Sequence, residues 1–299
     1  MNKVVARLGG KKAADAFRKT VSGDPSGEPV WAQQMAIGND AGLFGPESAV
    51  WQVHGCISTL VGGIRALLMQ AAHPAALTGV AEHSQYDTDP LGRLERTTRW
   101  LTITTFGSTE AIAQEARRVN ALHNRVTGEY PARDGSTKLY SAADPRHLLW
   151  VHCAFTDSFL RAHKELGYPI APGADQYVKE WSQSALPLGL THAPQSEEEL
   201  NETISSFAAD ETAAIKMTPP IVNFILNPPF SRGGLFFYRI LANAAIATMD
   251  EPFLSILGLK KRSKVWLRLS RKLLDFLSYM LGHESASQRI ARARIQALQ

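Results

Sequence analysis

The sequence predicts an all-α protein, and three observations carry this prediction. Apolar residues recur at helical spacing through most of the chain, as at Leu149, Trp150, Cys153 and Leu160. Many of these segments begin at Ser or Asp and end at Gly, the residues that cap helices. Alternation of the kind expected for a strand is confined to the short run "TITTF". We therefore expect helices packed on helices around one core.

Length and composition fit one large globular domain. The chain has 299 residues, 44% hydrophobic and 20% charged, enough to bury a core and enclose a small-molecule cavity. Its two cysteines, Cys56 and Cys153, lie far apart and exclude a disulfide framework or a structural zinc site. The sequence contains neither an apolar run of about 18 residues nor a recognisable secretion signal. We therefore expect a cytoplasmic protein.

The first half of the chain divides into an arm and several helices. Residues 1–44 are polar and glycine-rich, and are expected to form an N-terminal arm. A helix starts after Ser48, and the apolar segment "STLVGGIRALLMQAAHPAALTGVAEHS" predicts a buried helix that Pro74 interrupts at about His73. The glycines of "VGGIRA" follow no strand, so close helix packing explains them better than dinucleotide binding.

Two further helices flank a short turn in the middle of the chain. "TDPLGRLERTTRWLTITTFGS" predicts a helix opened by Asp89-Pro90 and closed by Gly107. Ser108 or Thr109 caps the next helix, which is expected to run to Gly128. After a loop at 130–137, "DPRHLLWVHCAFTDSFLRAHKEL" predicts an amphipathic helix, and later helices are expected near 173–184, 196–208, 210–226, 234–248 and 263–281.

The C-terminal segment, residues 251–299, is a basic extension of the main domain, 45–250. Its last forty residues hold ten Lys or Arg against two acidic residues. With Trp266, Phe276 and Tyr279, this segment predicts either peripheral contact with a membrane or another polyanion, or a solvated helix face docked on the body. No nucleic-acid partner is expected, and homo-oligomerisation stays open.

One histidine lies among apolar residues on the helix that begins near residue 109. His123 shares a helical stripe with Ile112, Ala116, Val119 and Val126, so we expect it to face the core. A buried imidazole requires a partner for each ring nitrogen. That partner is either a protein group, as in an ordinary core histidine, or a metal or haem iron.

A polar cluster occupies the preceding helix, in "RLERTTRW". Arg93, Thr97, Trp100 and Thr104 share one face, and Arg96 lies one step around it. Two arginines and a threonine beside an aromatic ring recognise an anion, a carboxylate such as a haem propionate, or bound oxygen. The alternative is a set of surface arginines paired with Asp87, Asp89 or Glu95.

Other polar positions carry weaker signals. His73 lies at the Pro74 interruption, where it is a candidate for proton transfer. The sequence contains no HExxH motif, no histidine pair at i, i+4 and no P-loop.

The motifs, taken together and in order, resemble the DUF2236 family. They are "GGIRALLMQAAHP", "GVAEHSQYDTDPLGRLERTTRWL", "FGS", "RRVNALHNRVTG", "YSAADPRHLLWVHCAFTDSF" and a later "LGL". The family includes the catalytic domains of latex clearing protein, a rubber oxygenase, and of the fungal mycophenolate-pathway oxygenase MpaB. The resemblance covers roughly residues 45–250.

This resemblance implies a b-type haem in a globin-like helical core, with His123 as the proximal iron ligand. Arg93 and Thr97 match an R-x-x-K-T arrangement near the distal haem face of latex clearing protein, where they would position dioxygen or anchor a propionate. Arg96 replaces the lysine of that arrangement, and arginine is a poor iron ligand because it stays protonated. We therefore expect an open or water-bound distal position.

The resemblance also directs the functional expectation. The upstream glutamate base of latex clearing protein has no match here; His73 is the nearest polar substitute and Glu82 a weaker one. We expect a haem b-dependent oxygenase that uses dioxygen on a small lipophilic molecule, such as an alkene or prenyl group. The alternative is a non-catalytic haem carrier or a sensor of oxygen or redox state.

Overall fold

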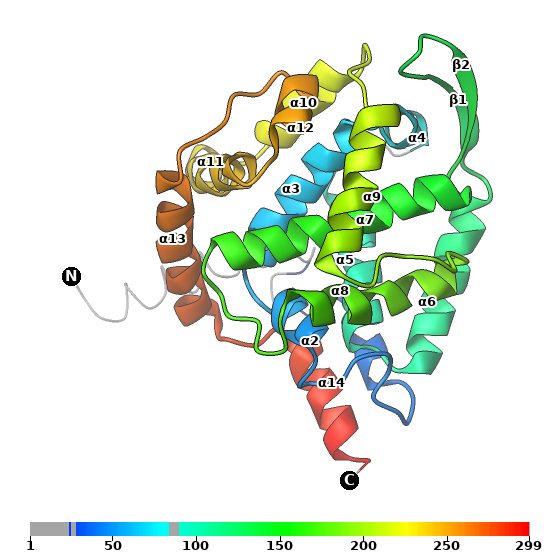
Figure 1. Ribbon diagram of the computed structural model, residues 1–299. Coiled ribbons are helices and arrows are strands. Elements are labelled where there is room, and N and C mark those ends of the chain that lie inside the picture. The colour runs from blue at the N-terminus through cyan, green and yellow to red at the C-terminus, as the bar shows by residue number, and fades with distance from the viewer. Residues whose placement is uncertain (1–23, 25–27, 84–89, 299) are drawn as a thin grey trace.

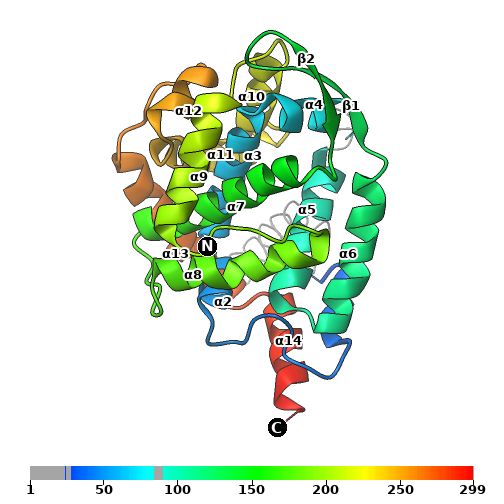
Figure 2. The same cartoon turned by 45° about the vertical axis from the view of Figure 1, so that its right-hand side comes forward.

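The computed structural model describes residues 24, 28–83 and 90–298, and the chain is mostly helical, which confirms the all-α prediction. The long helices α3 and α7 lie in the middle, with α5 and α6 on one side and α10 to α13 on the other (Figures 1 and 2). The elements are η1 (Val30–Ala36), α2 (Ala49–His54), α3 (Thr59–Ala71), α4 (Pro74–His83), α5 (Pro90–Phe106), α6 (Thr109–His123), β1 (Thr127–Pro131), β2 (Thr137–Ser141), α7 (Pro145–Glu165), α8 (Ala174–Ser182), η2 (Gln183–Leu188), α9 (Glu197–Asp210), α10 (Thr218–Leu226), α11 (Arg232–Ala247), α12 (Glu251–Ile256), α13 (Val265–Leu281) and α14 (Ala286–Gln296).

The packing of α3 against α7 forms the centre of the core. A Cβ atom on Gly62 would lie 2.5 Å from the Phe159 ring, so glycine allows the two helices to approach closely. This confirms the packing role predicted for Gly62; its neighbour Gly63 has open space beside it. One turn further along α3, the buried Arg65 forms an ion pair with Asp157 (2.6 Å) and donates a hydrogen bond to Ser158 (2.9 Å).

Helix starts follow the capping residues that the sequence indicates. The Ser48 hydroxyl accepts from the Trp51 amide at the start of α2, and Ser108 accepts from the Ala111 amide at the start of α6. Each cap satisfies one of the backbone N–H groups that a helix N-terminus leaves unpaired. The predicted starts after Ser48 and at Ser108 are therefore confirmed.

One local prediction was confirmed and one was wrong. The run "TITTF" belongs to α5, in agreement with the helix predicted to close at Gly107, because Ile103 and Phe106 are buried in the core and Thr105 donates to the Leu101 carbonyl within the helix. Tertiary packing here overrides the β-propensity of the run. By contrast, α6 ends at His123 rather than near Gly128, and the chain then enters a β-hairpin.

The hairpin occupies a segment that the sequence pattern assigned to a loop. Strands β1 and β2 pair in antiparallel register and are joined through Gly135, which has a φ of +81° that glycine adopts without strain. Tyr140 is buried against α4, where its hydroxyl lies 2.1 Å from the position that a Cβ on Gly79 would take. Tyr140 packing against Gly79 is thus one of the contacts that hold the hairpin to the body, together with the hydrogen bonds from Arg133 to the carbonyls of residues 208 and 212.

The end of the chain returns to the segment before α2. Trp31, Met35 and Phe44 are buried, and α14 packs against η1. Arg294 of α14 is also buried and donates to the backbone carbonyls of residues 35, 40, 41 and 106. Because residue 106 is the last of α5, a cation at this point also complements the helix dipole.

The remaining helices fall close to the predicted segments. Helix α10 is shorter than expected, since it begins at Thr218 with a proline in its first turn. Helices α12 and α13 contribute Phe253, Leu254 and Leu274 to the core. Within the described part of the chain, no helix has the length and apolar content needed to cross a membrane. Both cysteines are free thiols.

The central ion pair gives a stability prediction. Replacing Asp157 by Asn leaves the Arg65 charge buried without a counter-ion, which should lower the free energy of unfolding by about 3–5 kcal/mol. Chemical denaturation measures the loss. The exposed Asp134→Asn is the control and should leave the midpoint almost unchanged; an equal loss in both variants would contradict the prediction.

Candidate functional site

Helix α5 presents the predicted polar cluster. Arg93 belongs to α5, but its side chain lies outside the described part of the structure. Arg96 is exposed, while Thr97 and Trp100 are half-buried. Thr104 is fully buried, and its hydroxyl oxygen has no hydrogen-bond partner among the described residues. The face thus runs from solvent at its N-terminal end to an unsatisfied hydroxyl in the interior.

His123 is the last residue of α6 and is half-buried. Its Nδ1 atom is buried and has no hydrogen-bond partner in the described part of the chain. Burial lowers the pKa of His123 below its usual value, so the ring is neutral at pH 7. The predicted stripe on the inner face of this helix is therefore confirmed only in part. Its last member, Val126, lies beyond the end of α6 and does not share the face of His123. A neutral imidazole with an unpartnered buried nitrogen is suited to hold an additional group.

A buried carboxylate joins α5 to α6 and sets their relative position. Glu115 accepts hydrogen bonds from Arg99 of α5 (3.0 Å) and from Arg118 of its own helix (3.0 Å). The two helices are consecutive and joined by a short turn, so they run antiparallel. His123 therefore lies about two turns beyond this bridge, toward the end of the pair where Thr97 is found. The i, i+3 spacing of Glu115 and Arg118 was visible in the sequence, whereas the contact with Arg99 was not.

One face of α7 is linked to α5 through α2. Phe159 on this face contacts the ring of His54, which in turn hydrogen-bonds Thr105 of α5 (2.9 Å). On the same face, Phe155 lies about one turn earlier and His152 about two turns earlier, and both are half-buried. Burial lowers the pKa of His152 to about 4, and its Nε2 atom has no partner among the residues described. The sequence indicated no role for His152, because its burial comes from the packing of other helices.

His54 shows how a satisfied core histidine differs from His123. The Thr105 hydroxyl donates to the Leu101 carbonyl, so it accepts the proton of His54 Nδ1. The other ring nitrogen of His54 then accepts from the Tyr177 hydroxyl (2.9 Å). Burial lowers the pKa of His54 to about 3, and the neutral ring has a partner at both nitrogens. His54 therefore needs no external ligand.

His73 belongs to a different group of side chains. Its ring stacks on Trp150, and its Nε2 atom lies 3.5 Å from Glu211, too long for a good hydrogen bond. The neighbouring His73 ring and Arg146, which donates a hydrogen bond to Glu211 (2.7 Å), lower the pKa of Glu211 to about 2, while burial lowers that of His73. The side-chain contacts of His73 within the described residues are with α4, α7, α9 and Glu211, which follows α9. Its proposed proton-transfer role stays a prediction.

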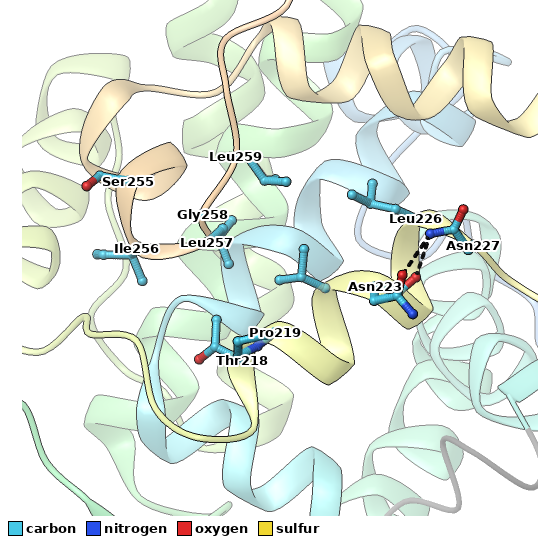
Figure 3. A pocket seen from close by; sticks show the side chains of 11 residues that line it. Thr218, Pro219, Asn223, Leu226, Asn227, Ser255, Ile256, Leu257, Gly258 and Leu259 are labelled. Atoms are coloured by element: carbon cyan, nitrogen blue, oxygen red, sulfur yellow. Dashed lines mark hydrogen bonds between the residues drawn. The ribbon is translucent and has the colours of Figure 1, made fainter.

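A surface groove lies elsewhere, between α10 and α12. It has a volume of about 410 Å³ and apolar walls, with Asn223 and Asn227 hydrogen-bonded to each other at one end (3.0 Å; Figure 3). None of the residues singled out from the sequence lines it. The groove is therefore separate from the polar cluster of α5 and α6.

The potential ligand side chains of the described residues suit a cofactor whose metal ion is already coordinated by the cofactor itself. In the described part of the chain, no three His, Cys, Asp or Glu side chains are arranged to hold a metal ion. A haem iron needs only one or two protein ligands, since the porphyrin supplies four nitrogens. His123, with a buried ring nitrogen lacking a partner, fits that requirement.

The comparison with known families agrees with the sequence resemblance. A family model described as "ER-bound oxygenase mpaB/B'/Rubber oxygenase, catalytic domain" matches residues 51–279. The chain therefore belongs to this family of oxygenase catalytic domains. The match extends past residue 250 and includes most of α13. Neither the curated proteins nor the solved structures compared with the chain contain a match.

The bridge between α5 and α6 can be tested by mutation. Glu115→Gln removes the charge shared by Arg99 and Arg118 and should lower the free energy of unfolding by about 1–2 kcal/mol. This is less than for a fully buried pair, because the arginines are 26% and 34% exposed and stay hydrated. Denaturant titration measures the loss, and the exposed Glu110→Gln should have little effect. Equal stability of the two variants would exclude the bridge as a stabilising contact.

The buried histidines predict acid sensitivity. His54 and His152 have folded-state pKa values of about 3 and about 4, below the ordinary 6.5 of an unfolded chain. Between pH 6.5 and 4 the unfolded chain therefore binds protons that the folded chain does not, so stability falls as pH falls. Each histidine contributes a slope of about 1.4 kcal/mol per pH unit. Denaturation between pH 7 and 5 should show a smaller slope for His152→Gln; an unchanged slope would contradict the assignment.

Proposed function

We propose that this protein is a haem b-dependent oxygenase in which His123 is the protein ligand to the iron, with dioxygen as oxidant and a small lipophilic molecule as substrate. The observation that supports this most directly is the buried, unpartnered Nδ1 of His123 in a chain of an oxygenase family. Leaving a buried ring nitrogen unsatisfied costs about 1–3 kcal/mol. Binding of a haem to this imidazole would offset that cost.

The state of His123 suits this role. Only a neutral imidazole has a free lone pair to donate, and burial keeps the His123 ring neutral by lowering its pKa. The Glu115 bridge fixes α6 against α5 and so limits where the ring can lie. When bound, a haem supplies the redox chemistry for using dioxygen, which side chains alone lack.

The α5 cluster supplies polar groups of two kinds. Arg96 carries a guanidinium group, which suits it to pair with a carboxylate or another anion rather than to ligate iron. Thr97 carries a hydroxyl that can donate to or accept from a small molecule. We assign Arg93 the same anion-binding role on the resemblance alone.

The surroundings of the cluster favour a lipophilic substrate. Trp100 and Leu101 of α5 and Phe155 of α7 are half-buried apolar side chains close in sequence to Thr97, Thr104 and His152. We propose that these side chains line the substrate pocket, where they would exclude water and bind an alkene or prenyl group through apolar contact. A few hydroxyl and imidazole groups would then fix the orientation of the substrate.

Haem binding is the first property to test. The purified full-length protein, supplied with haem, should show a Soret band in oxidised, reduced and carbon monoxide-treated samples. His123→Ala should abolish that band or shift it to the position of free haem. His192→Ala, at an exposed histidine, is the matched control and should bind as the wild type does.

Three outcomes would overturn the assignment in different ways. If the wild-type protein binds no haem, the proposed cofactor is wrong. If His123→Ala has an unchanged spectrum, His123 is not the iron ligand, although haem is still the cofactor. Haem binding without oxygen consumption, given a reductant and a series of alkenes, would favour the carrier or sensor function instead.

A further inference from the structure

Helix α13 has an apolar outer surface as well as an apolar inner one. Its inner residues, Leu267, Ser270 and Leu274, are buried against the body. On the opposite side, large apolar side chains remain exposed to solvent: Val265 (60%), Leu269 (42%), Phe276 (60%) and Met280 (42%). A surface helix of a water-soluble domain normally carries polar residues there. This outer face of α13 is therefore unexplained by the fold.

The four exposed side chains form one continuous stripe. Their spacing of 4, 7 and 4 residues places them within about 60° of one another around the helix axis. The stripe extends along most of a helix of 17 residues, which is about 25 Å long. Tyr279, 79% exposed, borders the stripe near its C-terminal end. Helix α13 lies at the edge of the molecule, beside α11 (Figures 1 and 2).

Positive charge borders the stripe. Residues 260–272 contain seven Lys or Arg and no acidic residue. Arg268 and Lys272 lie on one flank of the stripe, both exposed and neither with a recorded ion pair or hydrogen bond to a described residue. Lys260 and Arg262, just before α13, are also exposed, and their side chains likewise have no recorded ion pair or hydrogen bond to a described residue. These cations are thus available to a negatively charged partner.

We propose that the outer face of α13 docks on a lipid bilayer that contains anionic lipids, with the helix lying in the plane of the interface. An apolar stripe with flanking Lys and Arg and with aromatic rings is the pattern of helices that bind membrane surfaces. The cations meet anionic headgroups while Leu269 and Phe276 enter the acyl boundary. A second copy of the chain fits poorly, because it would bring two sets of basic residues together.

Vesicle flotation with the full chain tests this proposal without reference to enzymatic activity. The protein should float with phosphatidylcholine vesicles that contain phosphatidylserine and much less with pure phosphatidylcholine, and added salt should weaken the binding. The double variant Leu269→Ser, Phe276→Ser should bind at least about tenfold more weakly. Arg268→Gln with Lys272→Gln should lose about tenfold on the anionic vesicles alone.

A matched control separates the stripe from exposed apolar residues in general. Leu139→Ser removes an equally large side chain, 80% exposed, from β2 and should leave vesicle binding unchanged. Thermal unfolding should show that all variants fold. Absence of binding to anionic vesicles, undiminished binding in the Leu269 and Phe276 variant, or a dimer that this variant abolishes without any vesicle binding would each overturn the proposal.

The result is independent of the haem assignment. Vesicle binding is measured on the protein whether or not it contains haem, and His123→Ala should bind vesicles as the wild type does. Failure of haem binding therefore leaves this test intact, and failure of vesicle binding leaves the proposed function intact.

Discussion

The burial of Arg65 between α3 and α7 is the constraint around which the fold is arranged. A guanidinium group without solvent access needs a counter-ion, and Asp157 of the facing helix supplies it at 2.6 Å. Gly62 allows the close approach that this pairing requires. Helices α4, α10 and α11 then pack on α3, and α2, α8 and α9 pack on α7. The register of this one helix pair therefore sets the positions of most other elements.

The histidines of the core differ in how their ring nitrogens are satisfied, and that difference identifies the candidate site. His54 and His163 each have a partner for both nitrogens, the latter from Ser58 and the Pro169 carbonyl. For His123 and His152, and for His73, whose Nε2 lies 3.5 Å from Glu211, a buried nitrogen has no hydrogen-bond partner among the described residues. Burial lowers the pKa of all five rings, so charge does not distinguish them. Only an account of hydrogen bonds separates structural histidines from a ligand candidate.

The candidate site and the proposed membrane face lie on opposite sides of the molecule (Figure 1). Helices α5 and α6, which carry the candidate site, lie on one side of α3 and α7, and α13 lies on the other (Figure 1). On each side, the described residues leave a group without a matching contact. On α6 this group is the buried Nδ1 of His123, which has no hydrogen-bond partner. On α13 it is the apolar stripe, which is exposed to solvent and bordered by cations.

The sequence by itself determined the helical fold class, the caps at Ser48 and Ser108, the inward direction of His123 and the family. These depend on spacing and capping within short segments, which local physical chemistry governs. Tertiary structure decided that α6 ends at His123, that β1 and β2 form a hairpin, and that Glu115 pairs with Arg99. Each of these depends on contacts between residues distant in sequence, so no local pattern contains them. The same holds for the missing partner of His123 Nδ1, because only packing shows which groups come near a side chain.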